Sequence, residues 1–136
     1  MRYLAIDYGA KRTGLAVCDA EEILASPLRV IESSPALCEH ILQVIVELDI
    51  EALVLGLPFN MDGTEGFQAK AVRDFSNQLT RLTDLPIHYQ DERLSSYAAR
   101  EKRPDMRGRP GRRGKPLDAL AAAEILAAFL EQKREA

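Results

Sequence analysis

Three carboxylates at widely separated positions could act together on metal ions. Asp7 follows an apolar run at residues 4–6, Glu92 follows a second short run, and Asp118 lies at the start of an apolar stretch near the C-terminal end. Confined carboxylates repel one another unless cations neutralise them, and hard oxygen donors suit Mg²⁺ or Mn²⁺. Two such ions about 4 Å apart can activate water and stabilise the leaving oxygen of a phosphodiester. We therefore expect Asp7, Glu92 and Asp118 to form a two-metal site for phosphodiester hydrolysis.

Two of these assignments have alternatives in the sequence. Asp91 competes with Glu92, because adjacent strand residues point to opposite faces and only one can enter the site; Glu92 is preferred. Asp118 could instead complement the positive end of a helix, a stabilisation of about 0.3–1 kcal/mol.

Cys18 and Cys38 are far apart and belong to no Cys/His cluster, so we predict free thiols and no zinc site.

The positive charge of the chain is concentrated in one segment. The net charge is −3, yet residues 100–115 hold eight Lys/Arg and two Asp/Glu. Glycines and prolines are interspersed there, which predicts a flexible basic loop over residues 103–115. Such a run can be a simple solvated linker, but its place directly before Asp118 favours phosphate binding. The side chains expected to bind substrate phosphates are Lys11, Arg12, Arg93, Arg107, Arg109, Arg112, Arg113 and Lys115.

Strand patterns account for much of the remaining sequence. Residues 2–8, 13–18 and 22–31 predict three antiparallel strands at the start of the fold. Residues 52–57 are apolar on both alternations, which is typical of a parallel strand buried on two faces, and residues 86–90 predict a fifth strand. Strands 1, 4 and 5 should therefore lie side by side in parallel.

Three helices are predicted between and after these strands. Ser34 as N-cap and Pro35 as first helical residue predict one start, a second helix should run from about Glu65 to Leu82, and a third should begin at Pro116. The resulting order predicts an α/β fold with a five-stranded mixed sheet and helices on both faces. Ligands in such sheets gather at the carboxyl ends of the parallel strands, where Asp7 would lie.

The length and composition of the chain fit a single globular α/β domain. A chain of 136 residues suits a single domain covering residues 1–136, and 46% hydrophobic residues are ordinary for a globular protein. No apolar run is long enough to cross a membrane, and the start of the sequence has no secretory signal pattern, so we expect a cytoplasmic location without membrane partners.

Four sequence blocks carry a resemblance to a known family. They are Asp7-Tyr8-Gly9-Ala10-Lys11-Arg12-Thr13-Gly14, Gly56-Leu57-Pro58 with Asn60-Met61-Asp62-Gly63-Thr64, Asp91-Glu92-Arg93-Leu94-Ser95-Ser96, and Lys115 with Asp118 and Ala121-Ala122. Through them nearly the whole chain resembles the YqgF/RuvX family of Holliday-junction resolvases and pre-16S ribosomal RNA nucleases. Cys18 and Ser96 depart slightly, since the family more often has Ser and Thr there.

The resemblance implies a ribonuclease H-like fold and a divalent-metal nuclease with Asp7, Glu92 and Asp118 as its acidic triad. It also implies a cytoplasmic location and a part in maturing the 5′ end of small-subunit ribosomal RNA. The expected partner is nucleic acid, either pre-16S rRNA or branched DNA, and the sequence does not choose between them or between a monomer and a homodimer.

Two functions of other classes compete with the nuclease. The Ile6-Asp7 start and the later Gly14-Leu15-Ala16-Val17 resemble the phosphate loop of actin-like and sugar-kinase ATPases, but those proteins enclose ATP between two domains and this chain offers one. A catalytically silent RNA-binding module is the other alternative, and acids at all three expected positions argue against it.

Overall fold

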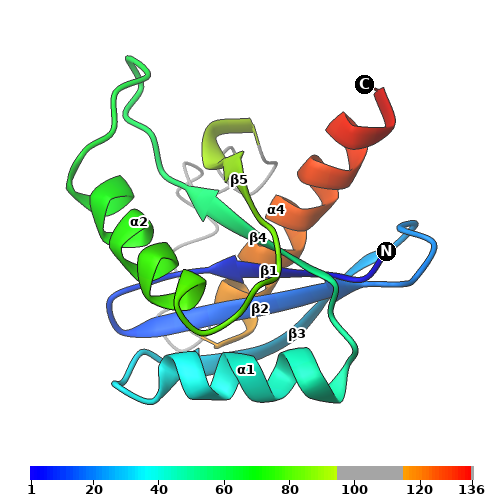
Figure 1. Cartoon of the computed structure of the whole chain (residues 1–136). Helices are drawn as coiled ribbons and strands as arrows, with labels where there is room; N and C mark the ends of the chain where they lie inside the picture. Colours follow the sequence, from blue (N-terminus) through cyan, green and yellow to red (C-terminus); the bar gives the residue numbers. More distant parts are fainter. Residues whose placement is uncertain (95–114, 136) are drawn as a thin grey trace.

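The computed structural model describes residues 1–94 and 115–135, with side chains for residues 1–93 and 119–135. Its elements are β1 (Tyr3–Asp7), β2 (Arg12–Cys18), β3 (Ala25–Glu32), α1 (Leu37–Glu47), β4 (Ala52–Leu57), α2 (Phe67–Thr80), β5 (Ile87–Asp91), the 3₁₀ turn η1 (Glu92–Leu94) and α4 (Lys115–Glu135). The strands form one five-stranded sheet in the order β3-β2-β1-β4-β5 (Figure 1).

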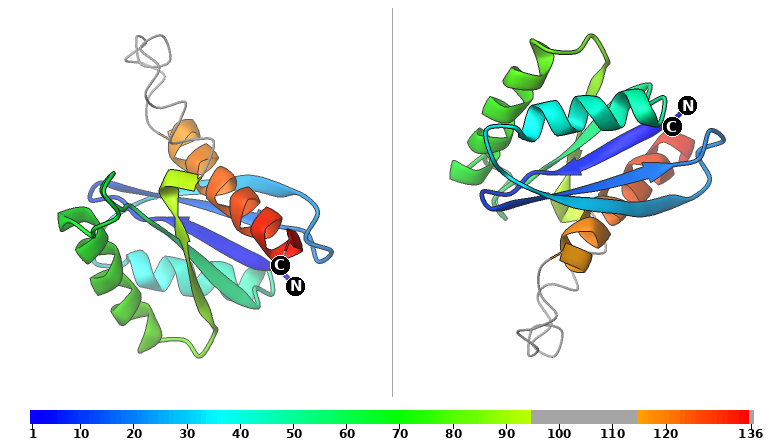
Figure 2. Two further views of the ribbon diagram at one scale, coloured as in Figure 1. Left: turned by 90° about the horizontal axis from the view of Figure 1, so that it is seen from above. Right: turned by 90° about the horizontal axis from the view of Figure 1, so that it is seen from below.

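The strand directions confirm the predicted mixed sheet. β2 pairs antiparallel with β1 and with β3, whereas β4 pairs parallel with β1 and with β5. α1 and α2 cover one face of the sheet and α4 crosses the other (Figure 2). The predicted α/β architecture with helices on both faces is therefore confirmed.

Two hydrophobic clusters hold the helices on the sheet. The cluster beneath α1 and α2 includes Leu4, Ile6, Leu53 and Leu55, and the cluster beneath α4 is built around small residues and a few large ones. Members of the second cluster include Tyr3, Ala5, Ala52, Val54, Ala122, Ile125, Leu126 and Leu130. Every residue of β4 is buried, which confirms the prediction of a strand covered on both faces.

The third strand begins later than the sequence predicted. It starts at Ala25 rather than at residue 22, because the chain first makes a tight turn. The Asp19 carboxylate accepts hydrogen bonds from the backbone N–H groups of Ile23 and Leu24, each at 2.8 Å, and Glu22 has a positive φ of 62°. The side chain of Asp19 thus delays the strand.

The predicted helix starts were also wrong by a few residues. α1 has Ala36 as its N-cap, while the hydroxyl of Ser34 accepts a hydrogen bond from the Ala36 backbone N–H before the helix begins. α2 starts after Glu65, since that residue pairs with Phe59 in an isolated β-bridge. The helix ends at Thr80, so Leu82, the predicted last residue, lies beyond it and is 53% exposed.

Further predictions concern the start of α4, the basic loop before it and the two cysteines. α4 begins at Lys115, one residue before the predicted start. The basic loop was expected at residues 103–115; Lys115 is instead the first residue of α4, and residues 103–114 lie outside the described ones. Both cysteines are free thiols, as predicted, and Cys18 is buried. Among the described helices, none is long and apolar enough to cross a membrane.

Candidate metal-dependent nuclease site

Asp7 and Gly56 lie side by side at the carboxyl ends of the parallel strands. Ile6 pairs with Leu55, so the next residues along the two strands, Asp7 and Gly56, are neighbours in the sheet. Because alternate strand residues face the same side, and Ala5 belongs to the cluster beneath α4, Asp7 also faces α4. The strand positions therefore present a carboxylate and a bare backbone toward the same helix.

The side chain of Glu92 occupies the space that Gly56 leaves open. A Cβ placed on Gly56 would lie 3.0 Å from Glu92 Oε1, 3.1 Å from Glu92 Cγ and 2.5 Å from Ile125 Cδ1. β4, η1 and α4 thus meet at this glycine, with the Glu92 carboxylate on the α4 side of the sheet. Asp7 lies on the strand next to it, so two of the predicted ligands face the same layer.

Asp91 lies in different surroundings. Its carboxylate accepts hydrogen bonds from the Arg93 guanidinium, the shortest being 2.7 Å from Nη2 to Oδ2. The Arg93 side chain holds the pKa of Asp91 below its ordinary value, although partial burial opposes this shift. Tyr89, two residues earlier on the same strand face, contacts Ser76 of α2 through a hydrogen bond of 2.5 Å. The strand therefore directs Asp91 toward the α2 side, and Glu92 toward α4.

The third predicted ligand is on α4, but its side chain is not among those described. Position 118 lies in the helix one and two turns before Ala122 and Ile125, both of which are buried against the sheet. Within the described side chains, no group of three Asp, Glu, His or Cys residues lies close enough to hold a metal ion. The carboxylate triad therefore remains a prediction that depends on Asp118.

Gln90 is a residue of this region that the sequence analysis did not select. It pairs with Gly56 across β4 and β5 and is 3% exposed. Its buried Nε2 has no hydrogen-bond partner among the described residues. Buried amide donors normally have an acceptor, so a buried donor without one among the described residues is unusual. Gln90 gave no distinctive signal in the sequence, because its neighbours at this strand end are also polar.

The predicted phosphate-binding residues fall into two groups. Lys11 is exposed in the turn after β1, and Arg12, also exposed, is the first residue of β2; both are close to Asp7 in sequence. Arg93 contacts Asp91 and two backbone carbonyls of the loop after β4. The side chains of Arg107, Arg109, Arg112, Arg113 and Lys115 lie outside the described ones.

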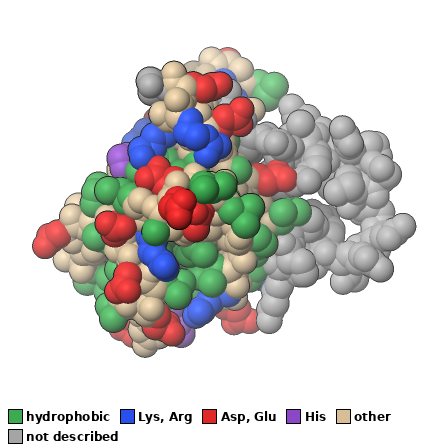
Figure 3. All heavy atoms as spheres, turned by 90° about the vertical axis from the view of Figure 1, so that its right-hand side faces the viewer, with side chains coloured by type: hydrophobic (Ala, Val, Ile, Leu, Met, Phe, Trp, Pro, Cys, Tyr) green, Lys and Arg blue, Asp and Glu red, His purple; other side chains and the backbone are tan. Residues whose placement is uncertain are grey.

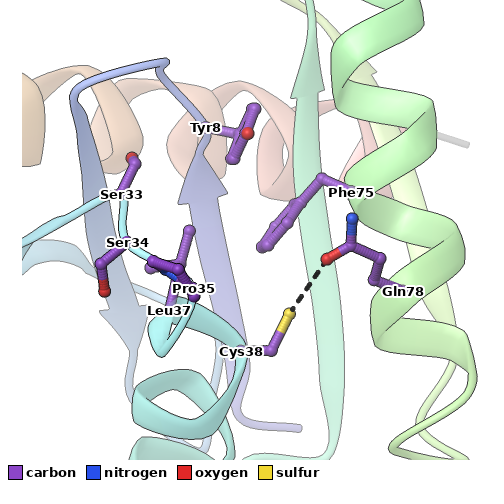
Figure 4. Close-up of a pocket in the computed structure, with 8 residues that line it drawn as sticks. All are labelled: Tyr8, Ser33, Ser34, Pro35, Leu37, Cys38, Phe75 and Gln78. Atoms are coloured by element: carbon purple, nitrogen blue, oxygen red, sulfur yellow. Dashed lines mark hydrogen bonds between the residues drawn. The ribbon is translucent and has the colours of Figure 1, made fainter.

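A small cavity lies on the opposite side of the sheet from Gly56. Figure 4 shows Tyr8 and Phe75 on one side of it and the Cys38 thiol directed toward Gln78. The rings of Tyr8 and Phe75 stack with centroids 4.5 Å apart. Its volume of about 80 Å³ is far below the roughly 300 Å³ or more of a small-molecule site, so this cavity does not fit a nucleotide.

The side of the molecule at the right of Figure 1 carries mixed charges. Acidic, basic and hydrophobic side chains alternate over this face, and its Lys and Arg side chains form no continuous patch (Figure 3). Nucleic acid binds best to concentrated positive charge. Among the described side chains in this view, positive charge is thus mixed with negative charge and with hydrophobic groups.

Comparison with solved structures confirms the ribonuclease H-like fold. The chain superposes on RuvC of T. thermophilus in complex with a Holliday junction substrate with a TM-score of 0.62 and 20% identity, covering 98% of this chain and 96% of RuvC. The fowlpox virus resolvase, solved with Holliday junction DNA, gives a TM-score of 0.58 at 11% identity and covers 98% of this chain and 99% of that one.

Sequence relatives are closer. A protein of Roseiflexus sp. (strain RS-1) named "Putative pre-16S rRNA nuclease" is 39% identical over 135 residues, which are 98% of this chain and 96% of the relative. A protein of the same name from Crocosphaera subtropica is 42% identical over 134 residues, covering 96% of this chain and 93% of that protein. The sequence profile of the RuvX family, described as Holliday junction resolvase, matches residues 1–132, and the chain therefore belongs to the RuvX family.

Proposed function

We propose that this RuvX-family nuclease hydrolyses phosphodiester bonds in structured nucleic acid with divalent cations held by Asp7, Glu92 and Asp118. The observation that supports the proposal most directly is the placement of Glu92 over Gly56, on the strand next to Asp7 and on the same side of the sheet. Asp7 and Glu92 come from separate elements on one side of the sheet, and carboxylate oxygens are donors that fit Mg²⁺ or Mn²⁺.

The proposed roles follow from where each residue lies. Asp7, at the end of the central strand, would hold the cations together with Glu92 and Asp118. When bound, such cations lower the pKa of water and stabilise negative charge on the leaving oxygen. Gly56 would keep the site open for Glu92, and Lys11 in the turn after β1 and Arg12 at the start of β2 would orient the phosphate backbone.

The proposed substrate is the precursor of 16S ribosomal RNA, with a branched DNA junction as the alternative. The names of the sequence relatives favour the RNA, whereas the family description and the RuvC complex favour the junction. The basic residues at 100–115 would bind phosphates of either nucleic acid, because phosphate contacts carry no base or sugar identity. Processing of ribosomal RNA would place the protein in the cytoplasm.

The test compares wild type with Asp7→Asn, Glu92→Gln and Asp118→Asn on a precursor 16S rRNA fragment and on a four-way DNA junction. Each reaction is run with Mn²⁺, with Mg²⁺ and with chelator. Each substitution should lower cleavage at least about a hundredfold, because the cations contribute several kcal/mol and 1.4 kcal/mol corresponds to a factor of ten. Asp84→Asn, at an exposed carboxylate before β5, is the matched control and should cleave like wild type.

The outcome also selects the substrate. Cleavage of only one nucleic acid identifies it, and binding without cleavage of either would favour the RNA-binding alternative. Cation-dependent cleavage that survives Asp7→Asn would refute the proposed ligand set.

A further inference from the structure

We propose that Arg93 is a positioning residue that fixes the carboxylate of Glu92, and that it is not a substrate contact. This inference rests on the proposed function, because it assumes that Glu92 holds a cation. It concerns the segment between the end of β5 and the loop after β4, where Arg93 joins parts of the chain that are 33 residues apart.

Arg93 forms several hydrogen bonds with Asp91, so the two residues that flank Glu92 are joined to each other. Its Nε lies 3.1 Å from each carboxylate oxygen of Asp91, and its Nη2 donates to Oδ2 at 2.7 Å. The backbone N–H of Arg93 also donates to Asp91 Oδ1 at 2.9 Å. The residues on both sides of Glu92 are thus tied to each other, which restricts rotation of the backbone that carries its side chain.

The same guanidinium fastens this turn to the loop after β4. Arg93 Nη1 donates to the carbonyl oxygens of Asn60 and Met61 at 3.3 and 3.5 Å, and its guanidinium carbon lies 5.3 Å from the centroid of the Phe59 ring. A cation over an aromatic face is a favourable contact in its own right. Arg93 therefore joins the turn that holds Glu92 to the strand end that holds Gly56.

The loop after β4 is itself held by hydrogen bonds between its own residues. The backbone N–H of Asn60 donates to the Thr64 carbonyl at 2.8 Å, and that of Gly63 donates to the Asn60 carbonyl at 2.9 Å. The Asp62 carboxylate accepts hydrogen bonds from the Thr64 hydroxyl at 2.6 Å and from its backbone N–H at 3.0 Å. The carbonyls that Arg93 contacts are consequently held in place.

These contacts argue against a direct phosphate contact. Nε, Nη1 and Nη2 of Arg93 already donate to protein acceptors, and the bidentate geometry with Asp91 is the one that a phosphate would need. Binding a phosphate in that geometry would mean breaking the contact that holds Glu92 in place. Lys11, exposed in the turn after β1, suits phosphate binding better.

The first test measures Mn²⁺ binding by calorimetry, without substrate. Arg93→Ala should weaken Mn²⁺ affinity by about tenfold or more, as is typical when groups that orient a metal ligand are removed. Arg93→Lys should weaken it similarly, because lysine keeps the charge but cannot form the fork of hydrogen bonds.

The matched control is Arg73→Ala. Arg73 makes a similar pair of hydrogen bonds with Glu65, at 2.6 and 2.7 Å, and lies 5.0 Å from the centroid of the Tyr89 ring, but it is not next to Glu92. The Mn²⁺ affinity of the Arg73→Ala variant should equal that of wild type. Equal loss in Arg73→Ala and Arg93→Ala would show a general effect on stability and would overturn the positioning role.

A double substitution separates positioning from direct binding. In a Glu92→Gln background, Arg93→Ala should have no further effect on Mn²⁺ affinity, because the group that it positions is already altered. Independent losses would contradict the proposal. The proposal would also be contradicted if Arg93→Ala lowered nucleic-acid affinity in the absence of metal and reduced the slope of log affinity against log salt concentration by about one. That result is the sign of a lost phosphate contact.

Failure of the proposed function gives a different result. If Glu92→Gln leaves Mn²⁺ affinity unchanged, Glu92 does not hold the cation and the proposed ligand set is wrong. The effect of Arg93 on the turn is measured separately by amide hydrogen exchange at residues 91–94, which should be faster in Arg93→Ala than in wild type or Arg73→Ala. Unchanged exchange at these residues would overturn the positioning role, whatever the result for Mn²⁺ affinity.

Discussion

At the scale of single residues, position 56 shows how an absent side chain can shape a site. The Gly56 backbone conformation is that of an ordinary strand, so the need for glycine comes from its neighbours, Glu92 and Ile125. The contact with Ile125 would be too close for any Cβ, and the contacts with Glu92 would force its carboxylate to move. Packing and the position of the Glu92 carboxylate therefore both depend on this glycine.

We expect Gly56→Ala to lower the free energy of unfolding by about 1–3 kcal/mol, as overpacking of a core usually does, and to weaken Mn²⁺ binding. Adding Ile125→Val removes the Cδ1 atom that the new methyl would meet at 2.5 Å. The double variant should regain part of the lost stability in urea unfolding, while its Mn²⁺ affinity stays low because Glu92 remains displaced. Full recovery of metal binding would show that Gly56 matters for packing alone.

At the scale of elements, the turn between β1 and β2 is fastened to the end of β3. The Ser33 hydroxyl donates to the Gly9 carbonyl at 2.6 Å and lies 2.8 Å from the hydroxyl of Thr13, which is fully buried. The Ser33 backbone N–H donates to the Lys11 carbonyl at 2.9 Å. This network holds the turn that follows Asp7 and carries Lys11, one of the predicted phosphate-binding residues.

Ser33→Ala should therefore lower the free energy of unfolding by about 1–3 kcal/mol, because it leaves the buried Thr13 hydroxyl without its partner. Urea unfolding with an unchanged m-value measures the loss. Ser34→Ala is the matched control, since the Ser34 hydroxyl is exposed and accepts one hydrogen bond of 3.2 Å. A loss in Ser33→Ala no larger than in Ser34→Ala would contradict the role given to this network.

At the scale of the whole molecule, Glu22 joins the two ends of the chain to the β2–β3 turn. Its carboxylate accepts hydrogen bonds from Lys133 Nζ at 2.6 Å and from the Met1 ammonium group at 3.0 Å, and its carbonyl accepts one from Arg134 at 3.0 Å. The hydrogen bond from Lys133 is the main cause that lowers the pKa of Glu22. The end of α4 is thereby held beside β1.

The lowered pKa of Glu22 predicts a pH-dependent contribution to stability. A carboxylate whose folded-state pKa is depressed stabilises the fold fully above its ordinary pKa of about 4.3, and this stabilisation is lost as the pH falls through the lowered value. The thermal midpoint of Glu22→Gln should be below that of wild type at neutral pH, and the difference should shrink in acid. Glu131→Gln, at an exposed position of α4, should show no such pH-dependent difference.

Much of this architecture could be predicted from the sequence because it follows from local patterns. Alternating and continuous apolar runs determined the five strands and their parallel or antiparallel directions, and Asp7 at the end of a buried strand indicated the edge of the sheet that holds the site. The starts of β3, α1 and α2 were wrong because they depend on single side-chain contacts, such as those of Asp19, that hydrophobic patterns do not record.

Only the tertiary structure decided how the two neighbouring acids divide between the faces of the sheet. Asp91 contacts Arg93, whereas Glu92 packs over Gly56, and the sequence offered both as alternatives. The importance of Gly56 and the contacts of Arg93 with the loop at Asn60 likewise involve residues some 33 or more positions apart. A local pattern determines which element a residue belongs to, but the partner of its side chain depends on which distant segments the fold brings together.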